Sequence, residues 1–182
     1  VYLADEDAVL PTELARLVIV MTGQQQGLSW HNQEPEQVNF FDLKGVLEGL
    51  FGELGLDVRY EPATHPSFRR GRTARLLLGE TQIGLMGELH PLVVENLDMR
   101  LEKNQPVLSA DIDLEAIYHQ VPPIRPYTPL SAYPAVHEDL AVVVPQTVPS
   151  DAVMQEIRKA GGYLLSQVEL FDVFSGGSLP VG

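Results

Sequence analysis

The sequence contains no cysteine, and this absence excludes several kinds of chemistry. The chain can form no disulfide, has no thiolate nucleophile and cannot build a cysteine zinc site. A lack of cysteine is compatible with a reducing compartment, where structural disulfides are rare. We therefore expect a cytoplasmic protein whose fold does not depend on covalent cross-links.

Long apolar runs are missing as well. Runs such as Leu17–Met21 are far shorter than the roughly 18 apolar residues that a membrane helix needs, so we expect no membrane partner. Residues 1–7 carry acidic rather than basic side chains, which is unlike a signal peptide. Because residue 1 is valine and not methionine, we expect the chain to begin inside a longer protein.

Basic residues are scarce. The chain has 12 lysines and arginines against 25 aspartates and glutamates, a net charge of −13. Proteins bind nucleic acids largely by neutralising phosphates, so this field argues against general nucleic-acid affinity of the chain alone. The remaining composition, with 45% hydrophobic and 20% charged residues, is typical of globular domains and argues against disorder.

Residues 14–54 begin with a strand and end with a helix. The apolar residues of 14–23 predict a buried strand, and the polar stretch 24–39 predicts a loop. Apolar residues at helical spacing over 40–54 predict a helix, with Asn39 as its N-cap and Gly55 as its stop. Three glycines inside this helix are expected to let it pack closely against a sheet: Gly45, Gly49 and Gly52.

The next sixty residues predict an antiparallel sheet that the helix covers on one face. Four further strands are expected at residues 57–62, 73–79, 82–89 and 107–114. The short turn at residues 79–82 joins the second and third of these strands into a hairpin. Two short helices are expected at residues 91–98 and 115–119.

A proline-rich stretch then separates two modules. Residues 121–129 carry four prolines, which is typical of an extended linker. After it we expect a strand at 137–144, a helix that Ser150 caps and that runs to Lys159, and a strand at 164–174. This order is half of a split β-α-β fold. The predicted boundaries are a first module at residues 1–120, a linker at 121–126 and a truncated second domain at 127–182.

Four arginines lie within seven positions: Arg69, Arg70, Arg72 and Arg75. We expect them just before a strand. Because the arginine fork matches phosphate and carboxylate groups, this cluster is a candidate anion contact. The alternative is a solvated loop whose charges compensate nearby acids, since blocks of like charge are usually exposed.

Other candidates for chemistry are weaker. Glu88 and His90 would share a strand face and form an acid–base pair or two metal ligands, although structural hydrogen bonding is the favoured interpretation. Trp30 and His31 suit stacking on a ring or base, but a loop tucked against its own domain is favoured. Asp111 and Asp113 are expected to be solvated.

Three tyrosines are further candidates for a binding surface, whereas two common signature motifs are absent. Tyr127, Tyr133 and Tyr163 would form either a base-stacking surface or an aromatic packing edge. The sequence has no phosphate-binding glycine loop and no Gly-x-Ser-x-Gly motif. We therefore predict no catalytic residue and no metal ligand in this chain.

Five segments, taken in order, carry a resemblance to a known family. They are Thr22-Gly23 with Trp30-His31; Val38-Asn-Phe-Phe-Asp-Leu-Lys-Gly45; His65-Pro66 with Gly71-Arg-Thr-Ala74; Ile83-Gly-Leu-Met-Gly-Glu-Leu-His-Pro91; and Ser131-Ala-Tyr-Pro-Ala-Val-His-Glu-Asp-Leu-Ala141 within residues 127–144. This series resembles the C-terminal part of the bacterial phenylalanyl-tRNA synthetase β subunit, and it covers nearly the whole chain.

The resemblance implies an α+β fold. Residues 1–120 would be the later part of a noncatalytic class II synthetase-like module with an antiparallel sheet, and residues from 127 the start of a ferredoxin-fold anticodon-binding domain, an α/β sandwich. The alpha subunit of such an enzyme adenylates phenylalanine with ATP and Mg²⁺ in an α2β2 assembly. This chain would bind no cofactor itself, support the alpha subunit and help to position tRNA(Phe).

One feature departs from that family. Its anticodon-binding domains often have a basic residue where this chain has His137-Glu138, and residues 127–182 hold two basic against six acidic side chains. Direct tRNA contact there is therefore in doubt. Two other functions stay open: a stand-alone synthetase paralogue that binds ATP or an amino acid, and a protein-interaction scaffold.

Overall fold

The computed structural model describes residues 2–3, 10–124, 127, 129 and 132–174. Its contacts divide the chain into two units, residues 1–128 and 129–182, and each unit is described by itself. Two residues of the predicted linker, Arg125 and Pro126, lie outside the described residues, as do residues 175–182 at the end of the truncated second domain.

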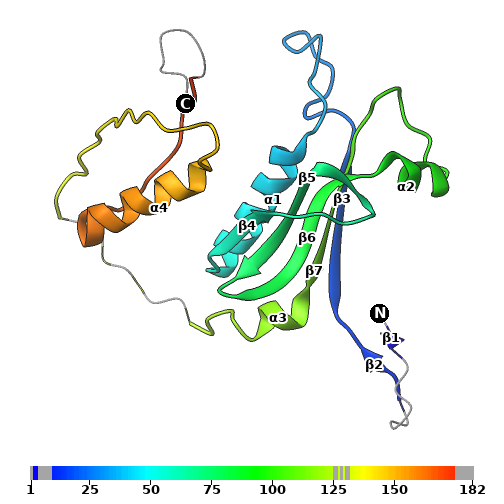
Figure 1. Cartoon of the computed structure of the whole chain (residues 1–182), viewed down its shortest axis with the longest axis horizontal. Helices are drawn as coiled ribbons and strands as arrows, with labels where there is room; N and C mark the ends of the chain where they lie inside the picture. The colour runs from blue at the N-terminus through cyan, green and yellow to red at the C-terminus, as the bar shows by residue number, and fades with distance from the viewer. Residues whose placement is uncertain (1, 4–9, 125–126, 128, 130–131, 175–182) are drawn as a thin grey trace. The chain divides into compact units, whose positions relative to one another are not determined.

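Unit 1 is built on a five-stranded antiparallel sheet with strand order β3-β7-β6-β5-β4 (Figure 1). The strands are β3 (Arg16–Thr22), β4 (Val58–Pro62), β5 (Phe68–Leu78), β6 (Thr81–Leu89) and β7 (Val107–Asp113). Two short strands, β1 (Tyr2–Leu3) and β2 (Thr12–Glu13), form a separate antiparallel pair. The predicted antiparallel sheet and the β5–β6 hairpin are confirmed.

Helix α1 (Phe40–Leu54) covers one face of the sheet (Figure 1). Asn39 and Asp42 form a capping box at its start, and Gly55 ends it in the left-handed conformation with φ 71°. Leu43, Leu47 and Phe51 are buried at about helical spacing, and they join buried side chains of β5, β6 and β7 in one core. The predicted helix and both of its ends are confirmed.

The glycines of α1 do not have the predicted role. Gly45, Gly49 and Gly52 are exposed, and a Cβ atom built on any of them would meet no other atom within 4 Å. The close contact with the sheet is made instead by the leucines and phenylalanine on the opposite side of the helix. The prediction that glycine brings this helix close to the sheet is therefore wrong.

Strand β3 is an edge strand rather than a buried one. Its residues alternate between exposed and half-buried, and Val18 and Val20 keep more than half of their surface exposed. The apolar run suggested burial on both faces, but β3 has a neighbour, β7, on one side only. Only the face toward α1 packs against the core, so this prediction is corrected.

Two short helices complete unit 1: α2 (Pro91–Asn96) and α3 (Leu114–Tyr118). Both helices are confirmed: α2 ends two residues before its predicted end, and α3 begins and ends one residue earlier than predicted. After α3, Val121 packs against the core, and Pro122 lies beside Gly55. The first residues of the proline-rich stretch therefore belong to unit 1.

In unit 2, helix α4 (Ser150–Gly161) is followed by a short 3-10 helix, Gly162–Leu164. The predicted helix is confirmed, but Pro149 rather than Ser150 is its N-cap residue, and no side chain caps it. No strand is formed at 137–144 or 164–174 within the described part of the chain, so these two predictions are wrong. The strands of a split β-α-β unit are not neighbours, and a sheet needs a third strand between them to satisfy their backbone groups.

Candidate functional site

The four arginines singled out in the sequence all lie in strand β5. This strand begins at Phe68, before the predicted start at residue 73, so the cluster belongs to the sheet and not to a loop in front of it. The pairing of β5 with β6 is irregular between Phe68 and Thr73, and Gly71 there has φ 78°. Apolar and polar residues alternate less regularly in a strand with such an irregularity, so the sequence pattern did not predict its first residues, 68–72.

Two glycines of β6 let the neighbouring strands approach closely. A Cβ atom at Gly84 would lie 2.5 Å from the carbonyl oxygen of Asp111 on β7. A Cβ atom at Gly87 would lie 2.5 Å from the carbonyl oxygen of Arg72 on β5. Any larger residue must displace backbone at both positions, so glycine is required there by packing.

Glu88 is the buried acceptor beside the second of these glycines. Its residue is only 6% exposed, and its carboxylate accepts a hydrogen bond from Arg69 at 2.5 Å and another from Arg72. Burial by itself raises the pKa of Glu88, but the hydrogen bonds and positive charges of the two arginines outweigh burial and leave this pKa below its ordinary value. Glu88 is therefore held as an ion.

The rest of the arginine cluster is only partly free to bind an anion. Arg75 donates to the carboxylate of Glu61 at 2.6 Å, and Glu61 also lies near Arg59. Arg70 is exposed and has no ion pair among the described residues. Three of the four arginines thus already have carboxylate partners, as the alternative interpretation supposes, and an anion or tRNA contact at this cluster stays a prediction.

Glu88 and His90 do not act as a pair. Strand β6 ends at Leu89, and His90 is the N-cap of α2, where its Nδ1 accepts from the backbone N–H of Leu92 at 3.2 Å. The backbone N–H of His90 donates to Ser67 at 2.8 Å. The interpretation as structural hydrogen bonding is confirmed, and no cluster of potential metal ligands occurs in the described ranges of the chain.

The sheet face opposite α1 carries a second set of ion pairs. Arg16 lies 2.8 Å from Asp111 and 3.7 Å from Asp113, and the hydrogen bond with Asp111 raises the pKa of Arg16. Asp113 also caps α3 by accepting from the backbone N–H groups of Glu115 and Ala116. The two aspartates were expected to be solvated, but they have structural partners.

Two small depressions lie on this face. The smaller, of about 100 Å³, is bordered by Arg16, Asp111 and Asp113. The larger, of about 500 Å³, is bordered by Pro62, Ala63, Thr64, His65, Arg75, Gln82 and Leu85. The charged residues of both depressions, Arg75 among them, are paired with one another or with neighbouring carboxylates, and Nδ1 of His65 accepts from the backbone N–H of Ser67. We therefore identify no reactive combination of side chains in either depression.

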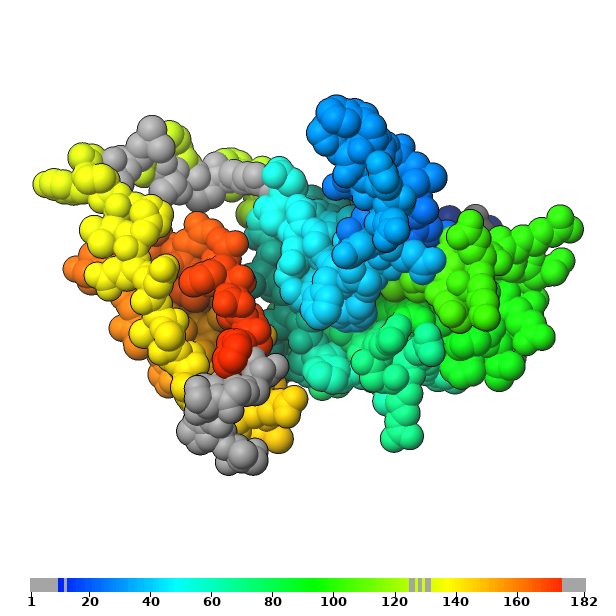
Figure 2. Space-filling model, turned by 90° about the horizontal axis from the view of Figure 1, so that it is seen from above, coloured from blue at the N-terminus to red at the C-terminus, as the bar shows by residue number. Residues whose placement is uncertain are grey.

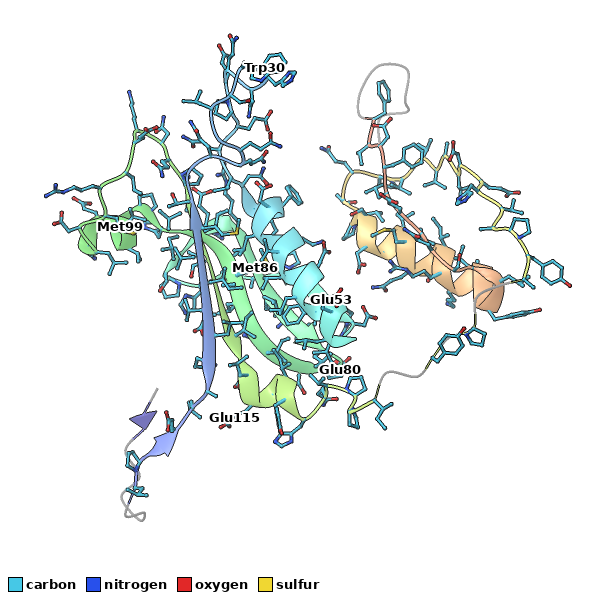
Figure 3. All side chains as sticks on the ribbon, turned by 180° about the vertical axis from the view of Figure 1, so that it is seen from behind. Trp30, Glu53, Glu80, Met86, Met99 and Glu115 are labelled. Atoms are coloured by element: carbon cyan, nitrogen blue, oxygen red, sulfur yellow. The ribbon has the colours of Figure 1, made fainter. Side chains whose placement is uncertain are left out.

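The polar loop before α1 stands away from the sheet. We call residues 24–37 the Trp30 loop, and Figure 2 shows it in blue as a projection from unit 1. Trp30 is 81% exposed, and Figure 3 shows it at the outer end of the loop. Its ring stacks on that of His31, with 3.4 Å between the centroids. The prediction that this loop tucks against its own domain is therefore wrong.

The three tyrosines near the linker are all exposed. Tyr127 and Tyr133 are each 82% exposed, and Tyr163 is 96% exposed. They do not form a buried aromatic edge within either unit. The described residues also include no helix long and apolar enough to cross a membrane.

Comparison with known proteins assigns both units. Residues 1–114 match the family described as "Phenylalanyl tRNA synthetase beta chain CLM domain". Residues 131–182 match the family described as "Ferredoxin-fold anticodon binding domain". The match to the second family gives unit 2 its fold assignment, although no strand is formed among its described residues.

Curated relatives extend this similarity over the chain. A phenylalanine–tRNA ligase beta subunit of Symbiobacterium thermophilum is 40% identical over 97% of this chain and 19% of the relative. The corresponding subunits of Geobacillus kaustophilus and Shouchella clausii are 36% and 35% identical over 100% of the chain and 22% of each relative. The chain thus spans about a fifth of the length of these relatives, and it belongs to the phenylalanine–tRNA ligase beta subunit family.

Proposed function

We propose that this chain is a noncatalytic part of a phenylalanine–tRNA ligase, which supports the catalytic alpha subunit and helps to position tRNA(Phe) during ATP-dependent aminoacylation. We infer the reaction from the family to which the chain belongs. The noncatalytic role rests on one observation in unit 1. A well-packed sheet is present, but its charged side chains are largely paired with one another, and the described residues hold no reactive combination.

We further propose that the sheet of unit 1 has the arrangement of a class II synthetase module. Its antiparallel strands and its single covering helix support this assignment. An adenylate site on such a sheet needs arginines directed at phosphate oxygens. In this chain Arg69, Arg72 and Arg75 are directed at carboxylates instead, which is why we assign ATP and phenylalanine to the alpha subunit.

We also propose that ATP and Mg²⁺ are bound by another chain of the enzyme and not by this one. No group of acidic or histidine side chains among the described residues is placed to hold a metal ion, and the arginines that would face a triphosphate are neutralised. Any chemistry that depends on them therefore takes place on another chain, which we propose to be the alpha subunit of a cytoplasmic α2β2 enzyme. Isothermal titration should give no heat with ATP, phenylalanine or both, and micromolar binding would favour a stand-alone paralogue.

Contact with tRNA should depend on the rest of the enzyme. Residues 127–182 hold six acidic and two basic side chains, and the chain as a whole carries −13, so long-range electrostatics oppose RNA binding. Stacking on exposed tyrosines contributes about 1–3 kcal/mol per base, which is too little to give tight binding alone. We expect weak or no tRNA(Phe) binding by the chain at about 150 mM salt.

Fluorescence anisotropy with labelled tRNA(Phe) tests this expectation, first with the chain alone and then with the alpha subunit and a complete beta subunit. Submicromolar binding by the chain alone would contradict the charge argument. If that binding disappeared in a variant with Arg69, Arg70 and Arg72 replaced by alanine, the arginine cluster would be a tRNA contact. Size-exclusion chromatography of the chain with the alpha subunit tests the supporting role, and a complex with an unrelated protein only would favour a scaffold.

A further inference from the structure

The Trp30 loop is an ordered projection. Its base is closed by a bridge between Gln24 and Gln37, and the backbone N–H of Gln25 donates to Glu36 at 2.9 Å. The side chain of Gln25 also donates to both carboxylate oxygens of Asp42, at 3.1 and 2.9 Å. These bonds tie the loop to the first turn of α1, which is itself fixed by its capping box.

The outer end of the loop is closed by a second set of bonds. The backbone N–H of Ser29 donates to the carbonyl of Asn32 at 3.0 Å, and the N–H of Asn32 donates back to the carbonyl of Ser29 at 3.1 Å. The two residues between them, Trp30 and His31, form the tip and stack on each other. Little conformational freedom is left for this tip to lose on binding, which favours affinity.

The tip exposes large apolar side chains that take no part in the core of unit 1. Trp30 is the single tryptophan of the chain and is 81% exposed, and Leu28 before it is 71% exposed. The same sequence has buried smaller apolar residues completely in the core, Leu43 and Leu47 among them. Exposed tryptophan that is held rigidly is a common anchor of protein interfaces, because its large ring excludes water when it enters a pocket.

The charge of the loop distinguishes between two kinds of partner. Residues 24–39 contain Glu34 and Glu36 and no lysine or arginine. A nucleic acid would be repelled by these carboxylates, and the loop itself offers no lysine or arginine to bind a phosphate. A protein with an apolar pocket bordered by basic side chains matches both features of the loop.

We propose that Trp30 anchors this chain to the alpha subunit by entering an apolar pocket with a basic border on that subunit. This inference rests on the proposed function for the identity of the partner. The tip is accessible to a partner, because the loop reaches beyond the end of the sheet at which α1 begins, whereas α3 lies at the opposite end (Figure 1; Figure 3, Trp30 and Glu115). The sheet and its core are therefore not disturbed when the tip is occupied.

The first test measures the affinity of the chain for the recombinant alpha subunit by calorimetry. Trp30→Ala should weaken binding about tenfold or more, and Trp30→Phe should recover part of the loss. Tyr118→Ala is the matched control: Tyr118 is 77% exposed and lies beside His119 on α3, as Trp30 lies beside His31, and we expect less than a twofold effect. Thermal melts of all variants should agree with the parent chain, since neither ring is buried.

The second test follows the ring itself. The chain is labelled with 5-fluorotryptophan, which gives a single fluorine resonance because the sequence has one tryptophan. Adding unlabelled alpha subunit should shift or broaden this resonance at the concentrations at which calorimetry detects binding. Replacing Glu34 and Glu36 with glutamine should weaken binding a few-fold and reduce its salt dependence.

The outcomes separate this inference from the proposed function. If the parent chain binds the alpha subunit but Trp30→Ala binds equally well, the Trp30 anchor is wrong and the proposed function stands. If Tyr118→Ala loses as much affinity as Trp30→Ala, the tip has no special role and the inference is again wrong. If Trp30→Ala lowers tRNA binding of the assembled enzyme and leaves subunit affinity unchanged, the partner is RNA. If the parent chain does not bind the alpha subunit at all, both proposals fail.

Discussion

Helix α1 and strand β6 both contain glycines, and the two elements use them in opposite ways. The glycines of α1 face solvent, and an added methyl group there would touch nothing. The glycines of β6 face neighbouring strands at distances that exclude any side chain. Side chains of both elements fill the core, but only on β6 does the backbone of a neighbouring strand lie where a side chain on the glycine would be. A glycine in a sequence thus allows backbone conformations and close contacts that other residues exclude. Only its surroundings in the fold decide whether glycine is required at that position.

The largest effect is expected where the helix meets the sheet. Leu47 is fully buried on α1, so Leu47→Ala removes apolar contacts and leaves a cavity, and it should lower the free energy of unfolding by about 2–5 kcal/mol. Urea denaturation measures the loss. The matched control is Val46→Ala on the neighbouring, 47% exposed position, which should cost below about 1 kcal/mol. Equal losses at both positions would mean that the helix is rotated from the orientation described.

The second effect tests the glycines of the strand. Gly84→Ala places a methyl group against the backbone of β7 and should lower the free energy of unfolding by about 1–3 kcal/mol or more. The amide exchange of β6 and β7 should rise in the same variant, because the added methyl group pushes these two strands apart. An unchanged melting curve would show that the strands have room for a side chain, and the contrast between α1 and β6 would disappear.

The third effect concerns the buried carboxylate of β6. Because the pKa of Glu88 in the folded chain lies below its ordinary value, Glu88 stabilises the fold above that ordinary value, and this contribution is lost as the pH falls through the folded pKa. Glu88→Gln should cost about 1–3 kcal/mol at pH 7 and much less in strong acid.

Urea melts at pH 7 and in the acid range measure this dependence. The difference in unfolding free energy between the two conditions should be smaller for Glu88→Gln than for the parent chain. Glu95→Gln on the exposed side of α2 is the control, and we expect its pH dependence to follow the parent chain. A parallel pH dependence of Glu88→Gln and the parent chain would mean that the arginines do not hold Glu88 ionised.

The smallest effect has the opposite sign. Gly49→Ala on the exposed side of α1 should raise the free energy of unfolding by about 0.5–1 kcal/mol, because alanine favours the helix and has room there. Gly55→Ala is the control at the end of the same helix, where φ is 71°, and it should destabilise the protein. Destabilisation by Gly49→Ala would mean that this face of the helix is covered by a partner.

Elements whose signals lie within a few residues were predicted well. The helix α1 was found with both ends, since a capping box and a left-handed glycine act on adjacent backbone groups. The β5–β6 hairpin was predicted from its turn. The five segments that resemble the synthetase family are short stretches of sequence, so their resemblance needs no knowledge of the fold. The predicted start of strand β5, residue 73, is too late, because apolar and polar residues do not alternate regularly in its irregular first half.

Properties that depend on distant neighbours were not predicted. The edge position of β3 follows from the order of strands, and the order of strands is decided by the whole sheet. The strands expected at 137–144 and 164–174 have suitable residues, but the described part of unit 2 provides no strand for them to pair with, and pairing is a property of two segments. The exposure of Trp30 was missed for a related reason: a tryptophan in a polar loop says nothing about whether another element covers it.

The sequence by itself determined the positions of the helices and most strands, the absence of cysteine chemistry and the family to which the chain belongs, because these depend on residue identity and on contacts between near neighbours. Only the tertiary structure decided that Arg69 and Arg72 hold Glu88, that Gly84 and Gly87 must remain glycine and that Trp30 is displayed at the end of a braced loop. Each of these depends on residues far apart in the chain, which come together only when the strands are placed in order. Local preferences bias the backbone, and burial of the core selects the arrangement in which the distant groups meet.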